Sequence, residues 1–323
     1  MLKKPLLSLI LLCCIVLFSS WGFFAHQKIN HLAVFTLPSQ MIKFYKNNIQ
    51  FITEHAVDPD KRRYADAAEA PRHYLDADHY GTSPFDSIPQ KWNEALKKYP
   101  LDTLNEHGIL PWQIQKSYNR LVKAFKERDS IRILKYSADI GHYIADAHVP
   151  LHTTQNHNGQ LSDQVGIHAF WESRLPELFS EDYDFFTGKA AYIEDPLKEA
   201  WKILRNTFSY KDSVLLIEAR LNKRFPSDRK YAYSTIKGKV SRQYSEAYSK
   251  KYHEQLNGMV ERQMRSSILA IGSYWYSAWV DAGQPDLNKM DKLFPIEQSE
   301  QDSIRKAEQL FINKSKVLGR PEE

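Results

Sequence analysis

Cysteine is almost absent from this chain. The only two, Cys13 and Cys14, lie within the first 20 residues. The rest of the chain can therefore form no disulfide and offers no thiolate to a metal. This excludes disulfide-stabilised small folds and structural zinc sites built on cysteine. Neither cysteine follows the small residues of a lipoprotein signal, so we predict no lipid anchor.

Glycine and strand patterns are also scarce. The 323 residues include 12 glycines, and alternating apolar and polar runs joined by Asn-Gly or Asp-Gly turns are almost absent, which argues against a β-rich fold. The content of hydrophobic residues (42%) and charged residues (26%) is ordinary for a soluble globular protein. The formal net charge of +5 is a mild basic excess, compatible with anionic ligands but diagnostic of none.

The first 20 residues have the composition of a secretory signal peptide. Two lysines precede an apolar run over residues 6–18, which is short for a membrane span, and two serines follow it. We predict cleavage after Ser20, so that the mature protein begins at Trp21 and is exported to the periplasm or the medium. Removing Lys3 and Lys4 takes the formal net charge from +5 to +3. The alternative is an uncleaved N-terminal anchor.

Helical periodicity dominates the remaining sequence. No Gly/Ser-rich linker divides residues 21–286, so we predict one all-α domain there, followed by a charged C-terminal tail over 287–323 whose end frays. Residues 53–90 are loop-like, with several prolines among many charges. The predicted helices are residues 25–36, 113–127, 130–148, 168–180, 194–207, 212–223 and a long run over 239–281 that can break near Asn257-Gly258.

Metal-binding side chains are concentrated in the middle of the chain. His142 and Asp146 are four residues apart and share one face of a predicted helix. A proline then ends that helix, which lets His152 turn toward the same region. His168 and Glu172 repeat the four-residue step. Imidazole and carboxylate without thiolate suit zinc in a catalytic site; the alternative for the first pair is a hydrogen-bonded His–Asp pair in the core.

Two earlier segments add candidates. In the loop-like region, Asp58 precedes the run His73-Tyr74-Leu75-Asp76. For the neighbouring acids Asp60, Asp66 and Glu69, the alternative to a role in the site is a solvated acidic loop. The nearby Arg62, Arg63 and Arg72 either meet a substrate phosphate or pair with acids of this loop, namely Asp58, Asp60 and Asp66. The second segment, Trp21-Gly22-Phe23-Phe24-Ala25-His26, would open the mature chain, where a free α-amine and its own carbonyl can chelate a metal.

Together these motifs resemble the family of S1/P1 nucleases and zinc-dependent phospholipases C. The resemblance rests on Trp-Gly-x-x-x-His, on Asp58 with the His73 run, and on the two later motifs, in the right order over residues 21–285. It implies an all-α, single-domain multi-helix phospholipase C/P1 nuclease-like fold with three zinc ions. It further implies an exported hydrolase that cleaves P–O ester bonds through a zinc-bridging hydroxide.

The resemblance also assigns roles to residues. Asp58 would act as the general base toward a zinc-bridging water. Tyr74 and Asp76 would contact the substrate, with packing beneath the zinc site as the equal alternative for Tyr74. The implied ligand sets are Asp58, His73, His142 and Asp146 for one zinc, His152, His168 and Glu172 for a second, and the Trp21 amine and carbonyl, His26 and a bridging Asp146 for the third.

The sequence mixes features of the family's two branches. The step from Trp21 to His26 and the position of Trp171 resemble the nucleases, whereas Glu172 and the short link from His152 to His168 resemble the phospholipases. The substrate therefore stays open between phospholipid and single-stranded nucleic acid. A transient contact with a membrane surface is included among the expected interactions, and no stable protein partner is expected. The alternative function is a non-catalytic zinc-binding or membrane-anchored protein with the same fold.

Overall fold

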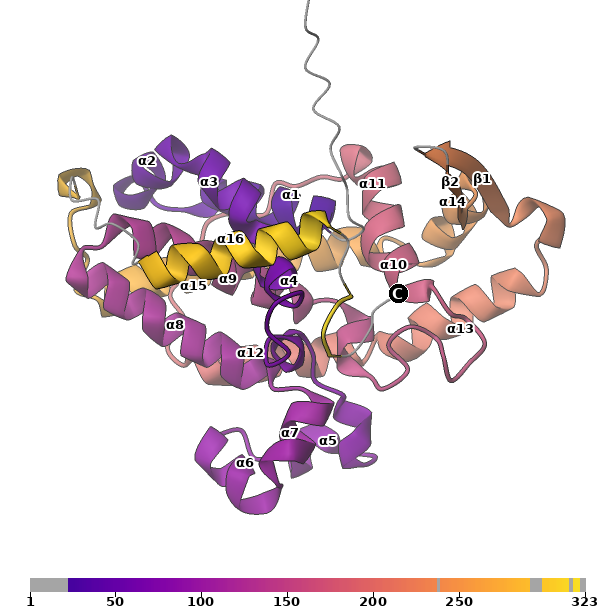
Figure 1. The fold of residues 1–323 in the computed structure, drawn as a ribbon, viewed down its shortest axis with the longest axis horizontal. Coiled ribbons are helices and arrows are strands. Elements are labelled where there is room, and N and C mark those ends of the chain that lie inside the picture. The colour runs from indigo at the N-terminus through magenta and orange to yellow at the C-terminus, as the bar shows by residue number, and fades with distance from the viewer. Residues whose placement is uncertain (1–22, 237–238, 291–297, 314–315, 320–323) are drawn as a thin grey trace, which may run out of the picture.

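Helices build most of the described chain, which in this computed structural model comprises residues 23–236, 239–290, 298–313 and 316–319 (Figure 1). The prediction of an all-α fold is confirmed. No helix among these residues combines the length and apolarity needed to cross a bilayer. The helices are α1 (Phe23–Ala33), α2 (Ser39–Asn47), α3 (Ile49–Glu54), α4 (Asp58–Arg62), α5 (Pro84–Ser87), α6 (Trp92–Lys98), α7 (Leu101–His107), α8 (Leu110–Glu127), α9 (Ser130–Asp146), α10 (Ile167–Ala169), α11 (Leu175–Phe179), α12 (Pro196–Phe208), α13 (Lys211–Asn222), α14 (Glu246–Gln255), α15 (Met259–Asp281) and α16 (Gln298–Ile312).

The long helical run predicted over 239–281 is partly wrong. It breaks where expected, because Gly258 has a φ of 72° between α14 and α15. Its first residues instead form strand β2 (Lys239–Tyr244), which pairs antiparallel with β1 (Tyr231–Ile236). Tyrosines alternate along β1, and this aromatic alternation favours a strand. At the base of the hairpin, Tyr244 stacks on Phe170 with ring centroids 3.9 Å apart.

Close packing of α1 against α9 sets the position of the site. A Cβ at Gly141 of α9 would lie only 2.1 Å from Asn30 Oδ1 of α1, so a glycine is needed for this approach. On the same two helices, the imidazole of His26 stacks on that of His142 with centroids 4.1 Å apart. The contact between the helix backbones therefore brings together side chains that are 116 positions apart in the sequence.

The loop-like region over residues 53–90 consists of short helical turns held by backbone hydrogen bonds. The N–H of Leu75 donates to the carbonyl of His152 at 2.9 Å, and that of Asp76 donates to the carbonyl of His107 at 2.7 Å. The turn after α9, a 3-10 helix over Pro150–Thr153, thus lies directly against the run that begins at His73. This arrangement places both motifs at one end of α9.

The C-terminal tail contains a helix, α16, that was not among the helices predicted from the sequence. Figure 1 shows α16 beside α4, and Phe311 of α16 lies against Phe23 and Tyr64 with ring centroids 5.3 and 5.5 Å apart. The N–H of Leu318 donates to the carbonyl of Arg63 at 2.9 Å. The tail therefore covers α4 instead of extending from the domain. Most of the segment predicted to fray, including 320–323, lies outside the described residues.

Candidate metal centre

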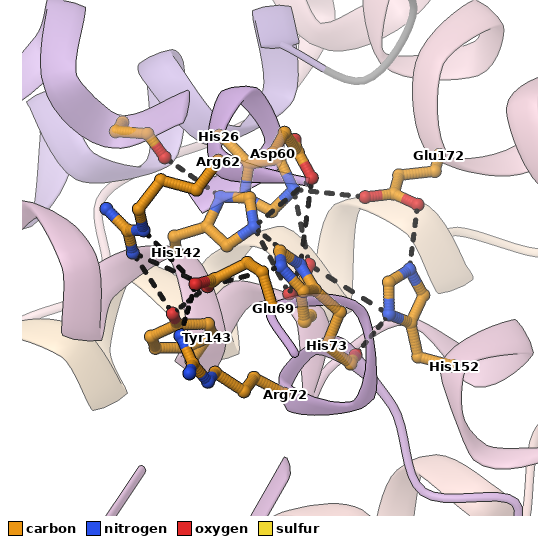
Figure 2. A network of polar contacts seen from close by, with 12 residues as sticks. His26, Asp60, Arg62, Glu69, Arg72, His73, His142, Tyr143, His152 and Glu172 are labelled. Carbon is orange, nitrogen blue, oxygen red and sulfur yellow. Dashed lines mark hydrogen bonds and ion pairs between the residues drawn. The ribbon is translucent and has the colours of Figure 1, made fainter. Parts of the chain in front are cut away.

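Histidine and carboxylate side chains converge where α1, α4, α9 and the helical segment that begins at Ile167 meet (Figure 2). Figure 2 shows His152 and Glu172 on one side of the group and Arg62, Arg72 and Tyr143 on the other. Three sets have ligand atoms within 4.8 Å of one another, and the first two share His142: His26, His142 and Asp146; Asp60, His73 and His142; and His152, His168 and Glu172.

The first cluster surrounds the end of α9. His142 Nε2 lies 3.1 Å from His73 Nδ1. Asp146 Oδ2 lies 3.0 Å from His73 Nδ1 and 3.3 Å from His142 Nε2. Asp60 Oδ1 is 3.6 Å from each of the same two nitrogens. Two imidazole nitrogens and two carboxylate oxygens, from three separate segments, thus face one small volume as possible metal ligands.

The second cluster contains the three side chains that the sequence grouped together. Glu172 Oε2 lies 2.8 Å from His168 Nε2 and 3.3 Å from His152 Nε2, and these two nitrogens are 3.2 Å apart. The helix that carries His168 and Glu172 widens into a π-helical turn over Phe170–Arg174. Pro176 follows and has no N–H to donate to the preceding turn, which favours this local widening.

Asp146 connects the two clusters through His26. The second oxygen of the carboxylate, Oδ1, lies 3.4 Å from His26 Nε2 and 4.0 Å from His152 Nδ1. His26 Nε2 is also 3.1 Å from Glu172 Oε1. The pairing of His26 with Asp146 agrees with the third ligand set implied by the resemblance. Trp21, the remaining member of that set, lies outside the described residues.

Asp58 does not join the clusters, and Asp60 takes the place assigned to it. Asp58 Oδ2 accepts a 2.6 Å hydrogen bond from His55 Nδ1, and its Oδ1 accepts one from Lys61 Nζ at 3.2 Å. Two residues on a helix are rotated by about 200° relative to each other, so when Asp60 of α4 faces His73, Asp58 faces away. The alternative interpretation of Asp60 as part of a solvated acidic loop is also wrong, because its side chain is only 20% exposed.

Backbone carbonyls fix how two of the imidazoles are protonated. A carbonyl only accepts, so His142 Nδ1 donates to the carbonyl of Ala56 at 2.9 Å and His152 Nδ1 donates to that of His73 at 2.5 Å. Each ring therefore turns the Nε2 lone pair toward its cluster, as in most metal-binding histidines, whose other ring nitrogen donates to a carbonyl or carboxylate. Asp146 Oδ2 is buried without a hydrogen-bond donor among the described residues. These inward lone pairs and this oxygen fit a divalent cation with nitrogen and oxygen ligands, as zinc is.

The electrostatics of the centre point the same way. Burial tends to lower the pKa of His73, but contact with the carboxylates of Asp146 and Glu69 outweighs it and raises the pKa to about 9. Burial tends to raise the pKa of Asp146, yet the neighbouring imidazoles of His142 and His152 hold it well below the usual range, because positive charge there, carried by a proton on the ring or by a cation at its Nε2, stabilises the carboxylate. The site is therefore built around charged carboxylates that require positive charge beside them.

Glu69 supports His73 from behind. Its side chain is fully buried, and Oε1 lies 3.6 Å from His73 Nε2. Arg62 Nε contacts the other oxygen at 3.2 Å, and Arg72 and the hydroxyl of Tyr143 donate to the same carboxylate. The alternative interpretation of Glu69 as part of a solvated acidic loop is thus wrong. Arg62 and Arg72 pair with acids, one of the two roles considered for them, but the partners differ from those expected. Arg62 pairs with Glu69 and Asp139, and Arg72 pairs with Glu69 and, at 3.8 Å, with the expected Asp66.

We expect Glu69→Gln to weaken zinc binding by about 10- to 100-fold, because loss of the carboxylate removes the group that orients His73 and balances its charge. Competition between the protein and a chromogenic chelator measures the affinity. Asp66→Asn is the matched control, since that half-exposed carboxylate contacts Arg72 at 3.8 Å and accepts from the N–H of Ala68 at 2.9 Å, away from His73. Equal zinc affinity in the Glu69 variant and this control would contradict the role given to Glu69.

A cavity of about 440 Å³ lies near the second cluster and contains both predicted substrate contacts. Tyr74 and Asp76 line it, together with His107 and His157. The hydroxyl of Tyr74 donates to the carbonyl of Glu106 at 3.2 Å. The ring of His157 lies 6.4 Å from that of His168, centroid to centroid. His107 and His157 received no functional role from the sequence, because only the folded chain brings them beside Tyr74.

His148 gives the protein a specific acid sensitivity. The ring is buried and donates from Nδ1 to the carbonyl of Ile144 at 2.8 Å, and burial lowers its pKa to about 4. The unfolded chain then binds one more proton between pH 6.5 and 4, so stability falls as the pH drops through this window. At pH 5 the loss from this group is about 2 kcal/mol.

The variant His148→Gln keeps a side-chain donor and removes the titrating group, so it should lose about 2 kcal/mol less than the wild type between pH 7 and 5. Urea unfolding of both proteins at the two pH values measures the difference. Protonation of the metal ligands affects both proteins alike and cancels. Parallel losses in wild type and variant would contradict this assignment.

Comparison with models of protein families identifies a match. The model of a protein family described as zinc dependent phospholipase C matches residues 25–235. No curated protein matches the chain. The matched segment covers about two thirds of the sequence and includes both clusters and, apart from Gly319, the residues that line the cavity beside Tyr74.

Proposed function

The chain belongs to the zinc-dependent phospholipase C family, and on that premise we propose that it hydrolyses phosphodiesters at the centre formed by the two clusters. Family membership supports a zinc-dependent hydrolase of phosphoester bonds. The observation that carries the proposal is the position of Asp146, whose two oxygens face different groups of imidazoles. A carboxylate placed in this way suits neighbouring metal ions better than a single one.

Three ions would be held by the side chains of these clusters. When bound, zinc lowers the pKa of a water and offsets negative charge on phosphoryl and leaving-group oxygens. His26 holds its ring between Asp146 and Glu172, and the Trp21 amine would complete its set. The proposed ligands are Asp60, His73, His142 and Asp146 for the first ion, His152, His168 and Glu172 for the second, and Trp21, His26 and Asp146 for the third.

Asp60 is the proposed general base. Its side chain is 20% exposed, whereas Asp146 and Glu172 are 1% and 9% exposed. It is therefore the carboxylate of the centre that an incoming water and phosphodiester can best approach. Asp60 would accept the proton of the attacking water at the carboxylate oxygen that does not bind the ion. This role passes to Asp60 from Asp58, which His55 and Lys61 hold away from the centre.

Part of the substrate would occupy the cavity beside Tyr74. Tyrosine and histidine rings together with the Asp76 carboxylate can bind either a polar headgroup or a planar base. The family match supports a phospholipid-type substrate, and single-stranded nucleic acid is the other branch. Export follows from the predicted signal peptide, and N-terminal sequencing of the secreted protein should begin at Trp21. A retained Met1 would remove the proposed third ligand set.

A side-by-side assay tests the function. Purified zinc-loaded protein is incubated with bis(p-nitrophenyl) phosphate, phosphatidylcholine, single-stranded DNA and RNA. We expect hydrolysis of the small diester and of one natural class, with both activities lost on chelation and restored by zinc. Stoichiometric zinc with no hydrolysis of any of the four substrates would favour the non-catalytic alternative.

A further inference from the structure

A second, larger recess lies between α6 and α8. Figure 1 shows α6 and α7 projecting from the body of the molecule. The recess has a volume of about 940 Å³. One of its lining residues, Glu94, is acidic. The cationic lining residues are Arg72, Lys91, Lys97, Lys116, Arg120 and Lys123.

Three of the six cations have no acidic partner among the described residues. Arg72 pairs with Glu69 and Asp66. Lys91 and Lys123 have acidic neighbours, Glu94 at 3.9 Å and Glu127 at 3.6 Å. Within the part of the chain that the structure describes, no carboxylate lies within ion-pair distance of Lys97, Lys116 or Arg120. Burial and the charges of Arg120 and Arg72 lower the pKa of Lys116. Cations facing one recess without partners repel each other, which an anionic ligand would relieve.

The cations are arranged in a line. Lys116, Arg120 and Lys123 follow one another at helical spacing along a single face of α8, and over seven residues this stripe is about 10 Å long. Lys91 and Lys97 lie on the opposite wall, next to and within α6. An extended ligand with regularly spaced negative charges matches this geometry better than a single phosphate group does.

The floor between the cations is aromatic and carries amides. Trp92 is half-buried, and its ring lies 5.2 Å from that of Trp112 at an angle of 64°. Ring systems of this kind stack planar bases whatever their identity. Amide side chains that can hydrogen-bond to base edges also line the recess: Asn93, Asn105, Gln113, Gln115 and Asn119.

The recess adjoins the cavity beside Tyr74. Asn105 lines both the recess and the 440 Å³ cavity beside Tyr74. Arg72, at the edge of the recess, immediately precedes His73 in the chain and contacts Glu69 behind that ligand. A chain-like ligand that lies along α8 therefore reaches the cavity without leaving the protein surface.

We propose that this α6–α8 recess binds single-stranded nucleic acid and holds part of the strand while another part reaches the metal centre. The inference rests on the proposed phosphodiesterase function and names its substrate class. Linear cations fit the phosphates, and the indole floor fits the bases. A phospholipid bilayer offers anionic headgroups too, but its flat surface cannot follow a recess walled by the projecting α6 and α7.

Direct binding tests the proposal with a charge-matched control. The test variant combines Lys97→Ala, Lys116→Ala and Arg120→Ala, all at exposed positions. The control combines Lys43→Ala, Lys223→Ala and Lys250→Ala, exposed lysines outside the recess. Each triple is placed on a His142→Ala background, so that the strand is not cut. Fluorescence anisotropy with a labelled oligothymidylate then gives Kd at several salt concentrations.

We expect the recess triple to raise Kd at least tenfold and to reduce the slope of log K against log salt by about two, because about 0.7 counterions are released per phosphate contact on a single strand. The control should stay within twofold. Without the His142 change, the recess triple should hydrolyse bis(p-nitrophenyl) phosphate within twofold of wild type and show a raised KM for single-stranded DNA.

Two results would overturn the proposal. The first is the same Kd for the recess triple and the control. The second is loss of binding to phosphatidylglycerol vesicles by the recess triple while oligothymidylate binding is kept, which would assign the recess to a membrane. Failure of the proposed function looks different: zinc-loaded wild type would not hydrolyse bis(p-nitrophenyl) phosphate, whereas the comparison of the two triples would still decide the role of the recess.

Discussion

Asp146→Ala should reduce hydrolysis of bis(p-nitrophenyl) phosphate by about 10³-fold or more, since a metal's contribution of several kcal/mol is lost and each 1.36 kcal/mol is a factor of ten. The reason is the position of the carboxylate. Its Oδ2 faces His73 and His142, and its Oδ1 faces His26 and His152. The same variant should therefore lose more than one equivalent of zinc, as measured by mass spectrometry of the metal content of the purified protein.

Asp139→Ala is the control for this experiment. Asp139 lies on the same helix, but its carboxylate pairs with Arg62 at 3.0 Å and does not face the clusters. We expect full zinc content and at most a tenfold loss of activity. If Asp146→Ala kept its zinc, or if the two variants lost activity equally, Asp146 would not be the residue shared between metals.

Asp60→Asn should lower kcat by about 10²- to 10⁴-fold, the usual contribution of a general base. Asp58→Asn should leave kcat within a few-fold of wild type and cost about 1 kcal/mol of stability through its lost hydrogen bonds. The amide is close in size to the carboxylate, so both variants should fold. Initial rates with bis(p-nitrophenyl) phosphate and thermal melts of the zinc-loaded proteins measure the two effects.

Comparing the two variants decides whether Asp58 or Asp60, two positions apart on α4, is the general base. The residues implied by family resemblance favour Asp58, whereas the geometry favours Asp60, 3.6 Å from His73 Nδ1. A large loss in Asp58→Asn together with a small one in Asp60→Asn would reverse the correction. The neighbouring pair His55 and Asp58 would then have to rearrange when zinc binds.

Residues at fixed helical steps could be predicted from the sequence. His142 with Asp146, and His168 with Glu172, share helix faces whatever the rest of the chain does. Both pairs lie where the sequence placed them. The turn at Pro150 brought His152 toward His168 as expected, to 3.2 Å between the Nε2 atoms. Local geometry was sufficient for these residues.

Features that depend on distant contacts could not be predicted. The choice between Asp58 and Asp60 depends on how the short α4 is rotated, and α16 packs on its outer side. The sequence alone suggests that Glu69 is a surface acid. Only the folded chain surrounds it with Arg62, Arg72 and Tyr143. The helix over Gln298–Ile312 has a charged sequence and one buried residue, Ala307, so its packing left little signal. The role of Trp21 stays a prediction.

Zinc titration of the metal-free protein tests the central claim most directly. Protein stripped of metal by chelation is titrated with zinc, while bound zinc and hydrolysis of bis(p-nitrophenyl) phosphate are followed in the same samples. We predict negligible activity without zinc and recovery only as more than one equivalent binds, because the clusters on both sides of Asp146 must be filled. Full activity in the metal-free protein, or saturation with zinc without hydrolysis, would contradict the account.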